Sequence, residues 1–143
     1  MSDSAGAADR SRILYAVLTF AVLGLGLASR SSAAQNLPKF VSAYSGDTLW
    51  ALMVFFLFAF VFRTSSSYRV AAYAGAFAAA IEVSQLFHFS WLEAIRSLPG
   101  MRLVFGYGFL WTDLLCYAVG ILIGWAADTI ICRRTGSGTA DKR

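Results

Sequence analysis

Four long apolar stretches constrain this chain of 143 residues more than any other feature of its sequence. Each approaches the length that a helix needs to cross a hydrocarbon core of about 30 Å, at about 1.5 Å per residue. The second stretch reaches that length only when it is extended back through residues 40–44, across a polar break at 45–47. The stretches cover residues 13–28, 48–62, 70–87 and 109–132. We therefore expect an all-α fold, a polytopic transmembrane helical bundle with four spans.

Composition supports this expectation and leaves no room for a separate soluble domain. Hydrophobic residues make up 58% of the chain and charged residues 14%, whereas about a quarter of the residues of soluble domains are charged. The predicted organisation is an N-terminal tail of residues 1–12, a transmembrane domain of residues 13–132 and a basic tail of residues 133–143. Between the third and fourth spans, the apolar spacing in residues 91–98 suits a short helix lying in the membrane interface, and Pro99 and Gly100 end it.

The basic residues cluster around the ends of the predicted spans and form no continuous stripe, which argues against a nucleic-acid partner and favours the lipid bilayer. With four spans both termini share a side, and that side carries eight Lys and Arg residues against four on the other. The positive-inside rule then places both termini in the cytoplasm. One alternative stays open: residues 13–34 also resemble a signal peptide that ends in Ser32-Ala33-Ala34, although Arg30 is unusual there.

A polar triplet interrupts the apolar sequence. Glu82 and Gln85 close the third stretch and Asp113 opens the fourth, where a charge is costly unless it is paired or hydrated. Arg96 is the nearest candidate counter-charge. The predicted topology puts the triplet on the outer side together with further charged residues, so we expect one outward-facing polar cluster of Glu82, Gln85, Arg96, Asp113, Arg30, Asp47 and Arg102.

Simpler structural interpretations exist for several members of this cluster. Asp47 follows Gly46 and suits the N-cap of the second span, and Arg30 suits a side chain that reaches the interface from the end of the first. Glu82, Arg96 and Asp113 also fit a buried triad that only holds helices together. The sequence alone leaves the functional and structural readings open.

Small residues predict how the last two spans pack. Gly75, Ala79 and Glu82 share one face of the third helix. One face of the fourth carries Asp113, Tyr117, Gly120 and Gly124. The spacing of the two glycines in the fourth helix is typical of close helix packing in membranes. Each carboxylate lies seven residues from a glycine, so we predict that Gly75 packs opposite Gly120, which brings both carboxylates to one depth. Ala78 is predicted to lie off this face.

No motif indicates a cofactor, a metal or a catalytic nucleophile. Cys116 and Cys132 lie about 24 Å apart on one predicted helix, too far for a disulfide. The cysteines and the single histidine, His88, have no spacing typical of a zinc or haem site. We therefore expect no catalytic residues, metal or cofactor, and the sequence does not reveal an oligomeric state.

The motifs resemble those of a known group of bacterial membrane proteins. Glu82-Val-Ser-Gln85-Leu, the following Arg96, the segment 106–114 that ends in Asp113-Leu, and the glycine pair at 120 and 124 are similar to motifs of VanZ-like proteins. Residues 12–128 more closely resemble a bacterial family of small integral membrane proteins of unknown function. That family also shares the Gly46-Asp47-Thr48-Leu49-Trp50 motif. The resemblance implies a location in the bacterial cytoplasmic membrane and a role at the cell envelope.

Three functions fit these observations. The first is a non-enzymatic binding or accessory protein whose outward-facing cluster contacts a lipid head group, a cell-wall precursor or an envelope protein, with an anionic or polyprenyl lipid among the candidates. The second is a subunit of a proton- or ion-coupled transporter, because intramembrane carboxylates often lie on such paths. The third is an intramembrane enzyme that uses Glu82 and Asp113 as an acid–base pair.

Overall fold

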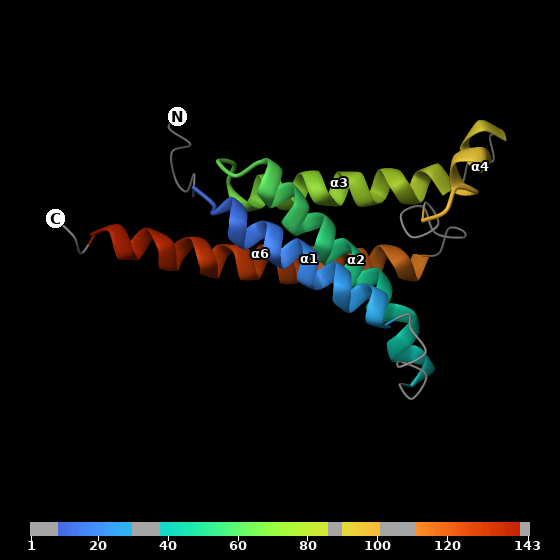
Figure 1. Cartoon of the computed structure of the whole chain (residues 1–143), viewed down its shortest axis with the longest axis horizontal. Helices are drawn as coiled ribbons and strands as arrows, with labels where there is room; N and C mark the ends of the chain where they lie inside the picture. The colour runs from blue at the N-terminus through green and yellow to red at the C-terminus, as the bar shows by residue number, and fades with distance from the viewer. Residues whose placement is uncertain (1–8, 30–37, 86–89, 101–110, 141–143) are drawn as a thin grey trace.

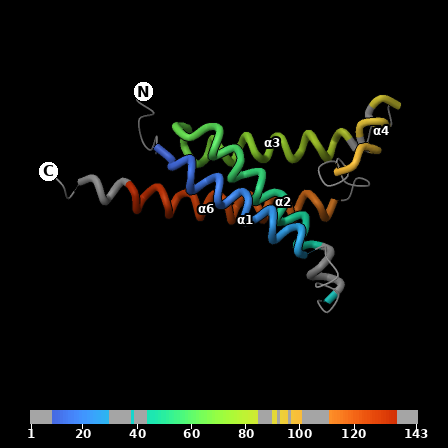
Figure 2. The backbone as a smooth tube through the Cα atoms, viewed as in Figure 1, coloured from blue at the N-terminus to red at the C-terminus, as the bar shows by residue number. Residues whose placement is uncertain are grey.

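The computed structural model describes residues 9–29, 38–85, 90–100 and 111–140. These residues form helices and turns, without a strand in the described ranges. The helices are α1 (Arg12–Ser29), α2 (Lys39–Val61), α3 (Ser67–Gln85), α4 (Ser90–Arg96) and α6 (Trp111–Ala140). The four long helices alternate in direction (Figures 1 and 2). We call the end that holds Arg12, the turn 62–66 and Ala140 the termini end, and the end that holds α4 and Trp111 the α4 end.

Helix α2 lies at the centre of the bundle, in contact with α1, α3 and α6, and α3 also packs against α6. A short turn joins α2 to α3, because the N–H of Phe62 donates to the carbonyl of Phe58 and Ser65 donates to Phe62. The main core therefore forms where α2 meets its neighbours. Its buried members are Tyr15, Val22, Val54, Phe55, Phe56, Ala59, Val70 and Ala74.

Three of the helices are long and apolar enough to cross a membrane: Arg12–Ser29, Tyr44–Val61 and Trp111–Thr135. Helix α3 corresponds to the third predicted span but is not among them. Its apolar centre is short and rich in alanine, and polar residues such as Arg69 and Glu82 lie near its two ends. Crossing by α3 and a position of α4 in the membrane interface therefore stay predictions, while a helix close to the predicted segment 91–98 is confirmed as α4.

Large apolar side chains cover the outside of the bundle. Ile13 is 80% exposed, Phe20 71% and Leu115 69%. Soluble monomers rarely expose contiguous apolar surface on this scale, whereas such side chains are at home among lipid tails. The exposed apolar surface and the three long apolar helices together describe a small membrane protein.

Helix α2 runs without a break through the polar segment 45–47. The helix begins after Pro38, so Asp47 lies well inside it, and the prediction that Asp47 is the N-cap of the second span is wrong. Glycine is tolerated inside membrane helices when neighbouring helices pack against it, and Gly46 is buried. Helix α6 likewise continues past residue 132, where the sequence predicted a tail.

Gly120 and Gly124 let α6 approach α2 closely. A Cβ atom on Gly120 would lie 2.3 Å from the carbonyl oxygen of Thr48, and one on Gly124 would lie 2.6 Å from the ring of Phe55. The two glycines are thus confirmed as packing residues, but their partner is α2. The prediction that Gly75 packs opposite Gly120 is wrong, because a Cβ on Gly75 would meet only Ile121, at 3.8 Å.

The packing face of α3 also differs from the predicted one. Ala78 is 2% exposed and belongs to a small core cluster with Ala51 and Tyr117, whereas Ala79 is exposed. The buried face follows the spacing of Ala74, Ala78 and Glu82, which lie one helical turn apart. Both the inclusion of Ala79 in that face and the exclusion of Ala78 from it are therefore wrong.

The glycine contacts generate a test with a matched pair of substitutions. Gly120→Ala should lower the free energy of unfolding by about 1–3 kcal/mol, because its methyl group cannot fit against the backbone of α2. Gly75→Ala should leave stability unchanged or raise it by up to about 1 kcal/mol, because the methyl group fits and alanine favours the helix. Titration with a denaturing detergent in mixed micelles measures both. Equal losses in the two variants would contradict the assigned packing.

Candidate functional site

Glu82 is a fully buried carboxylate in the last part of α3, near the α4 end. Its Oε2 atom accepts a hydrogen bond of 3.2 Å from the hydroxyl of Tyr117 on α6. Burial opposes a charge at this position, which marks Glu82 as the leading candidate for a functional residue.

Aromatic packing fixes the position of Tyr117. Its ring centroid lies 5.1 Å from that of Trp50 on α2, and Trp50 also stacks on Phe77 of α3 at 6.4 Å. Ala51 and Ala78 complete the packing around Tyr117. Because Ala51 and Ala78 are small, the phenol ring of Tyr117 fits from α6 into the space between α2 and α3. Its hydroxyl there points at Glu82.

Two more carboxylates lie near this pair. Asp47 on α2 and Asp113 on α6 are both within electrostatic reach of Tyr117, and both are half-buried. Asp113 lies in the first turn of α6, where the helix dipole stabilises a negative charge. Tyr117 thus contacts the carboxylate of Glu82, and the charges of Asp47 on α2 and Asp113 on α6 also act on it. We call Asp47, Glu82, Asp113 and Tyr117 the acidic cluster.

Several residues of the predicted outward-facing cluster cannot be placed here. Gln85 ends α3 and Arg96 ends α4, but their side chains lie outside the described part of the structure. Arg30 and Arg102 fall outside the described residues altogether. Of the seven predicted residues, the structure brings together Asp47, Glu82 and Asp113. Among the described side chains no three His, Cys, Asp or Glu residues are grouped as metal ligands would be.

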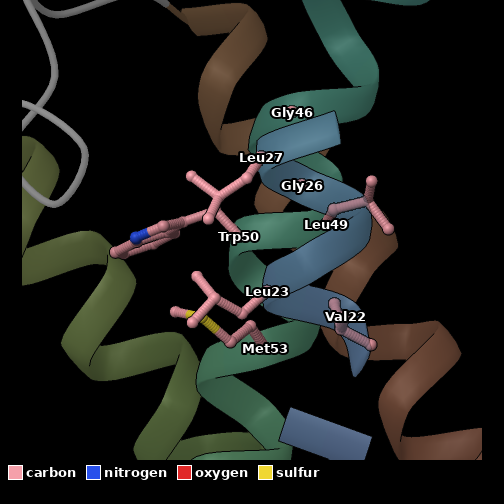
Figure 3. A pocket seen from close by; sticks show the side chains of 8 residues that line it. All are labelled: Val22, Leu23, Gly26, Leu27, Gly46, Leu49, Trp50 and Met53. Atoms are coloured by element: carbon pink, nitrogen blue, oxygen red, sulfur yellow. The ribbon is translucent and has the colours of Figure 1, made fainter. Parts of the chain in front are cut away.

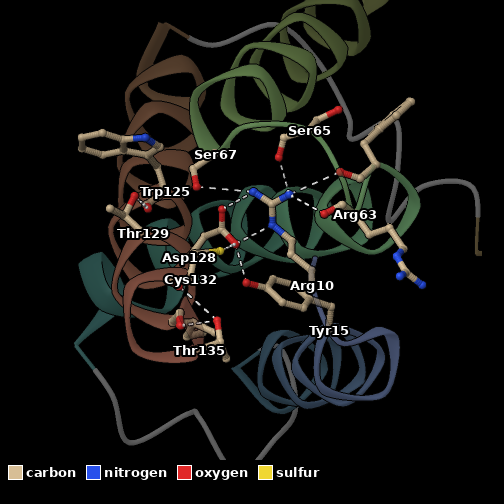
Figure 4. A network of polar contacts seen from close by, with 12 residues as sticks. Arg10, Tyr15, Arg63, Ser65, Ser67, Trp125, Asp128, Thr129, Cys132 and Thr135 are labelled. Atoms are coloured by element: carbon tan, nitrogen blue, oxygen red, sulfur yellow. Dashed lines mark hydrogen bonds and ion pairs between the residues drawn. The ribbon is translucent and has the colours of Figure 1, made fainter. Parts of the chain in front are cut away.

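A second polar cluster lies near the termini end, where Arg10 and Asp128 form a fully buried ion pair (Figure 4). Arg10 Nε donates to Asp128 Oδ1 at 2.7 Å, and its Nη2 donates to Oδ2 at 2.6 Å. The hydroxyl of Tyr15 donates to Oδ1, and the thiol of Cys132 donates to the same oxygen at 3.6 Å. This bidentate geometry is the strong form of an arginine–carboxylate pair.

The rest of the Arg10 guanidinium binds the turn between α2 and α3. Nη1 donates to the carbonyl oxygens of Phe62, Arg63 and Ser65 at 2.5–3.3 Å, and Nη2 lies 3.4 Å from the hydroxyl of Ser67. Burial by itself lowers the pKa of Arg10, but the hydrogen bond and the charge of Asp128 outweigh it and hold that pKa above its ordinary value.

The position of Arg10 corrects one expectation about the N-terminal tail. The sequence placed Arg10 in a cytoplasmic tail as a topology determinant, but its side chain is only 4% exposed. It also makes α1 part of the folded bundle, because cleavage near Ala34 would remove Arg10 and Tyr15 and leave the Asp128 carboxylate buried without them. The signal-peptide alternative itself stays a prediction.

Sequence reasoning did not assign Arg10 or Tyr15 to a site, and it placed Tyr117 only on the packing face of the fourth helix, although signals for all three existed. Asp128 is an acidic residue in the second half of an apolar stretch, where a partner is required, and Arg10 was predicted on the same side of the membrane. Tyr117 shares a helix face with Asp113 at a spacing of one turn. Pairing acidic and basic residues by predicted depth would have indicated the first pair.

Comparison with known families identifies the group to which these features belong. A family model described as a protein of unknown function, DUF2809, matches residues 36–121, which is more than half of the chain. The chain belongs to the DUF2809 family. No solved structure matches it.

The range that the DUF2809 model matches contains one of the two polar clusters and excludes the ion pair of the other. All four members of the acidic cluster lie within residues 36–121, while Arg10 and Asp128 lie outside. The match agrees with the resemblance to a family of unknown function, and nothing in it supports the VanZ-like group in particular. The acidic cluster is therefore the better candidate for a site that this family shares.

The buried ion pair generates a stability test. Arg10→Gln or Asp128→Asn should each lower the free energy of unfolding by about 3–5 kcal/mol, because one buried charge loses its partner. The exposed pair of Arg63 with Asp9 is the control, and Asp9→Asn should cost at most about 1 kcal/mol. Detergent-induced unfolding measures all three. Similar effects for Asp9→Asn and Asp128→Asn would contradict a structural role for the buried pair.

Proposed function

We propose that this DUF2809 protein is a non-enzymatic binding or accessory protein of the bacterial cytoplasmic membrane, and that its acidic cluster contacts a lipid head group or a lipid-linked envelope precursor. The observation that carries the proposal is the full burial of Glu82 at the α4 end, held by Tyr117 with Asp47 and Asp113 nearby. Carboxylates accept hydrogen bonds and attract cations, so the ligand groups that fit are hydroxyls, amides and amines.

The other residues that the sequence predicts for the outward-facing cluster complete this proposed site. Arg30, Arg96 and Arg102 are its candidate contacts for phosphate, since arginine binds phosphate through paired hydrogen bonds, and Gln85 is a candidate for amide contacts. The resemblance to VanZ-like proteins belongs to the same proposal and agrees with a ligand from the cell envelope. An envelope protein that presents the same groups is the second kind of partner that fits.

A proton- or ion-coupled transporter fits the structure less well. Tyr117 and Asp128 are eleven residues apart on α6, which separates the two polar clusters by about 16 Å. The core between them consists of apolar side chains such as Phe55, Val54 and Ala74. A path for ions or protons needs polar groups or water along its length, and the described side chains of this core are apolar.

An intramembrane enzyme also finds little support in the acidic cluster. Acid–base chemistry on a substrate would need the reacting bond to lie between Glu82 and Asp113, and the described contact of Glu82 is with the hydroxyl of Tyr117. The described hydroxyl of Ser84 donates to the carbonyl of Ile81 at 2.5 Å. Neither feature resembles an activated nucleophile, which requires a base within hydrogen-bond distance.

The charges of the described residues support a cytoplasmic location for the termini end. That end carries exposed arginines at positions 12, 69, 133 and 134, while the α4 end carries Asp47, Glu82, Glu93 and Asp113. Basic residues favour the cytoplasmic side of a membrane protein. The proposed topology therefore turns the acidic cluster toward the outside of the cell, where envelope precursors are used.

Cysteine labelling tests this topology. Thr64 in the α2–α3 turn and Ser97 after α4 are both exposed, so each can be changed to cysteine in a chain whose Cys116 and Cys132 are alanine. A membrane-impermeant maleimide added to intact cells should label Ser97→Cys, and it should label Thr64→Cys only after the membrane is opened. Labelling of Thr64→Cys alone in intact cells would reverse the assignment.

Substitution of Glu82 tests the binding site. Glu82→Gln keeps the shape of the side chain but removes the charge, and it should abolish complementation of a deletion strain under envelope stress while protein abundance stays normal. Tyr117→Phe should weaken complementation in the same way, because the ring still packs but no hydroxyl reaches Glu82. Growth of the complemented strain and immunoblots of the membrane fraction are measured together.

Two further variants separate a site from a structural role. Glu93→Gln is the matched control, since Glu93 is an exposed glutamate at the same end, and it should complement fully. If Glu82 only pairs with Arg96 to hold the helices, Glu82→Gln should instead reduce abundance, and adding Arg96→Gln should restore it. Lost abundance with that rescue would overturn the proposed function.

A further inference from the structure

A lateral pocket lies between α1 and α2, in the half of the bundle nearer the α4 end (Figure 3). It exists because Gly26 on α1 and Gly46 on α2 contribute no side chains. Its cavity volume is about 50 Å³, a few times the roughly 10–15 Å³ that one water-sized probe needs, so it is a narrow groove with room for one slender group. Its walls include Leu23 and Leu27 of α1 and Trp50 and Met53 of α2.

The surroundings of the pocket determine what can fill it. Its walls are almost entirely carbon, so water would find no polar partners there. All of its lining residues lie within Arg12–Ser29 or Tyr44–Val61, two segments long and apolar enough to cross a membrane. The medium outside the pocket is therefore hydrocarbon, and a flexible hydrocarbon chain is the occupant that this medium supplies.

Trp50 connects the pocket to the acidic cluster. One part of its indole lines the pocket, and the ring also packs on Tyr117, whose hydroxyl donates to Glu82. Figure 3 shows the indole reaching from α2 beside Leu27 and Leu23 toward α3. A chain in the pocket would thus press on the residue that positions Tyr117. The pocket and the acidic cluster share this one wall.

We propose that the pocket between α1 and α2 binds one hydrocarbon chain of a membrane lipid, and that this chain is the apolar half of the ligand whose polar group meets the acidic cluster. The inference rests on the proposed function for the polar half of the ligand. The pocket itself is tested separately, because chain contact is read at Trp50 while the proposed function is read by complementation at Glu82.

The test measures quenching of Trp50 fluorescence by a phospholipid with brominated chains. Trp91, Trp111 and Trp125 are exposed and are changed to phenylalanine, so that Trp50 is the reporter. A phosphatidylcholine with brominated chains is titrated into the protein in detergent micelles. Quenching should saturate near one lipid per chain, whereas contact with the general lipid shell would rise without saturation.

Two glycines on α1 supply a matched pair of variants. Gly26→Leu fills the pocket and should reduce the saturable quenching by at least half. Gly24→Leu should leave it unchanged, because a Cβ atom there meets nothing within 4 Å. Gly26→Ala places its Cβ in ordinary contact with Leu49 at 3.8 Å, so it should fold normally and give an intermediate loss if Gly26→Leu does not fold.

Three outcomes would overturn the inference. Quenching that rises linearly in the unsubstituted reporter would mean contact with the lipid shell only. Equal quenching in Gly24→Leu and in the pocket-filling variants would place the chain elsewhere on α1. Saturable quenching that Glu82→Gln leaves unchanged would show that the bound chain does not belong to a ligand of the acidic cluster. Saturable quenching that weakens in Glu82→Gln, together with lost complementation, would support both halves of the site, while intact complementation would overturn the proposed function and leave the pocket standing.

Discussion

The buried pair of Arg10 and Asp128 is the constraint on which the arrangement of the bundle depends. One guanidinium binds the carboxylate of α6 and three carbonyl oxygens of the α2–α3 turn, and Tyr15 brings α1 to the same carboxylate. Four segments of the chain therefore meet at one point. Removing two charges from water costs several kcal/mol per ion, so this geometry persists only because nearly every donor of Arg10 has an acceptor.

Close packing of α6 on α2 sets the other end of the bundle. Because Gly120 and Gly124 let α6 lie directly against α2, Tyr117 is carried into the space between α2 and α3. There it meets Trp50 on one side and Glu82 on the other. The geometry of the acidic cluster thus depends on two glycines that make no polar contact with it. A larger residue at position 120 would move Tyr117 away from Glu82.

Local patterns in the sequence predicted the helices better than they predicted the contacts between distant segments. The apolar stretches indicated the long helices, and the cost of a buried charge singled out Glu82, which is fully buried. The partner of Gly120 could not be predicted, because α3 carries alanine on every face and sequence neighbours were assumed to pair. The break at residues 45–47 was misread because glycine ends helices in water but is tolerated within packed membrane helices.

The contact between Arg10 and Asp128 has a consequence for the order in which the protein is made. The two residues are 118 positions apart, so at about 5–20 residues per second of synthesis roughly 6–24 s pass between the appearance of one and of the other. During this interval α1, α2 and α3 are made while Arg10 still lacks its carboxylate partner on α6. The bundle becomes complete only when the last helix emerges, which makes synthesis of α6 the closing event of assembly.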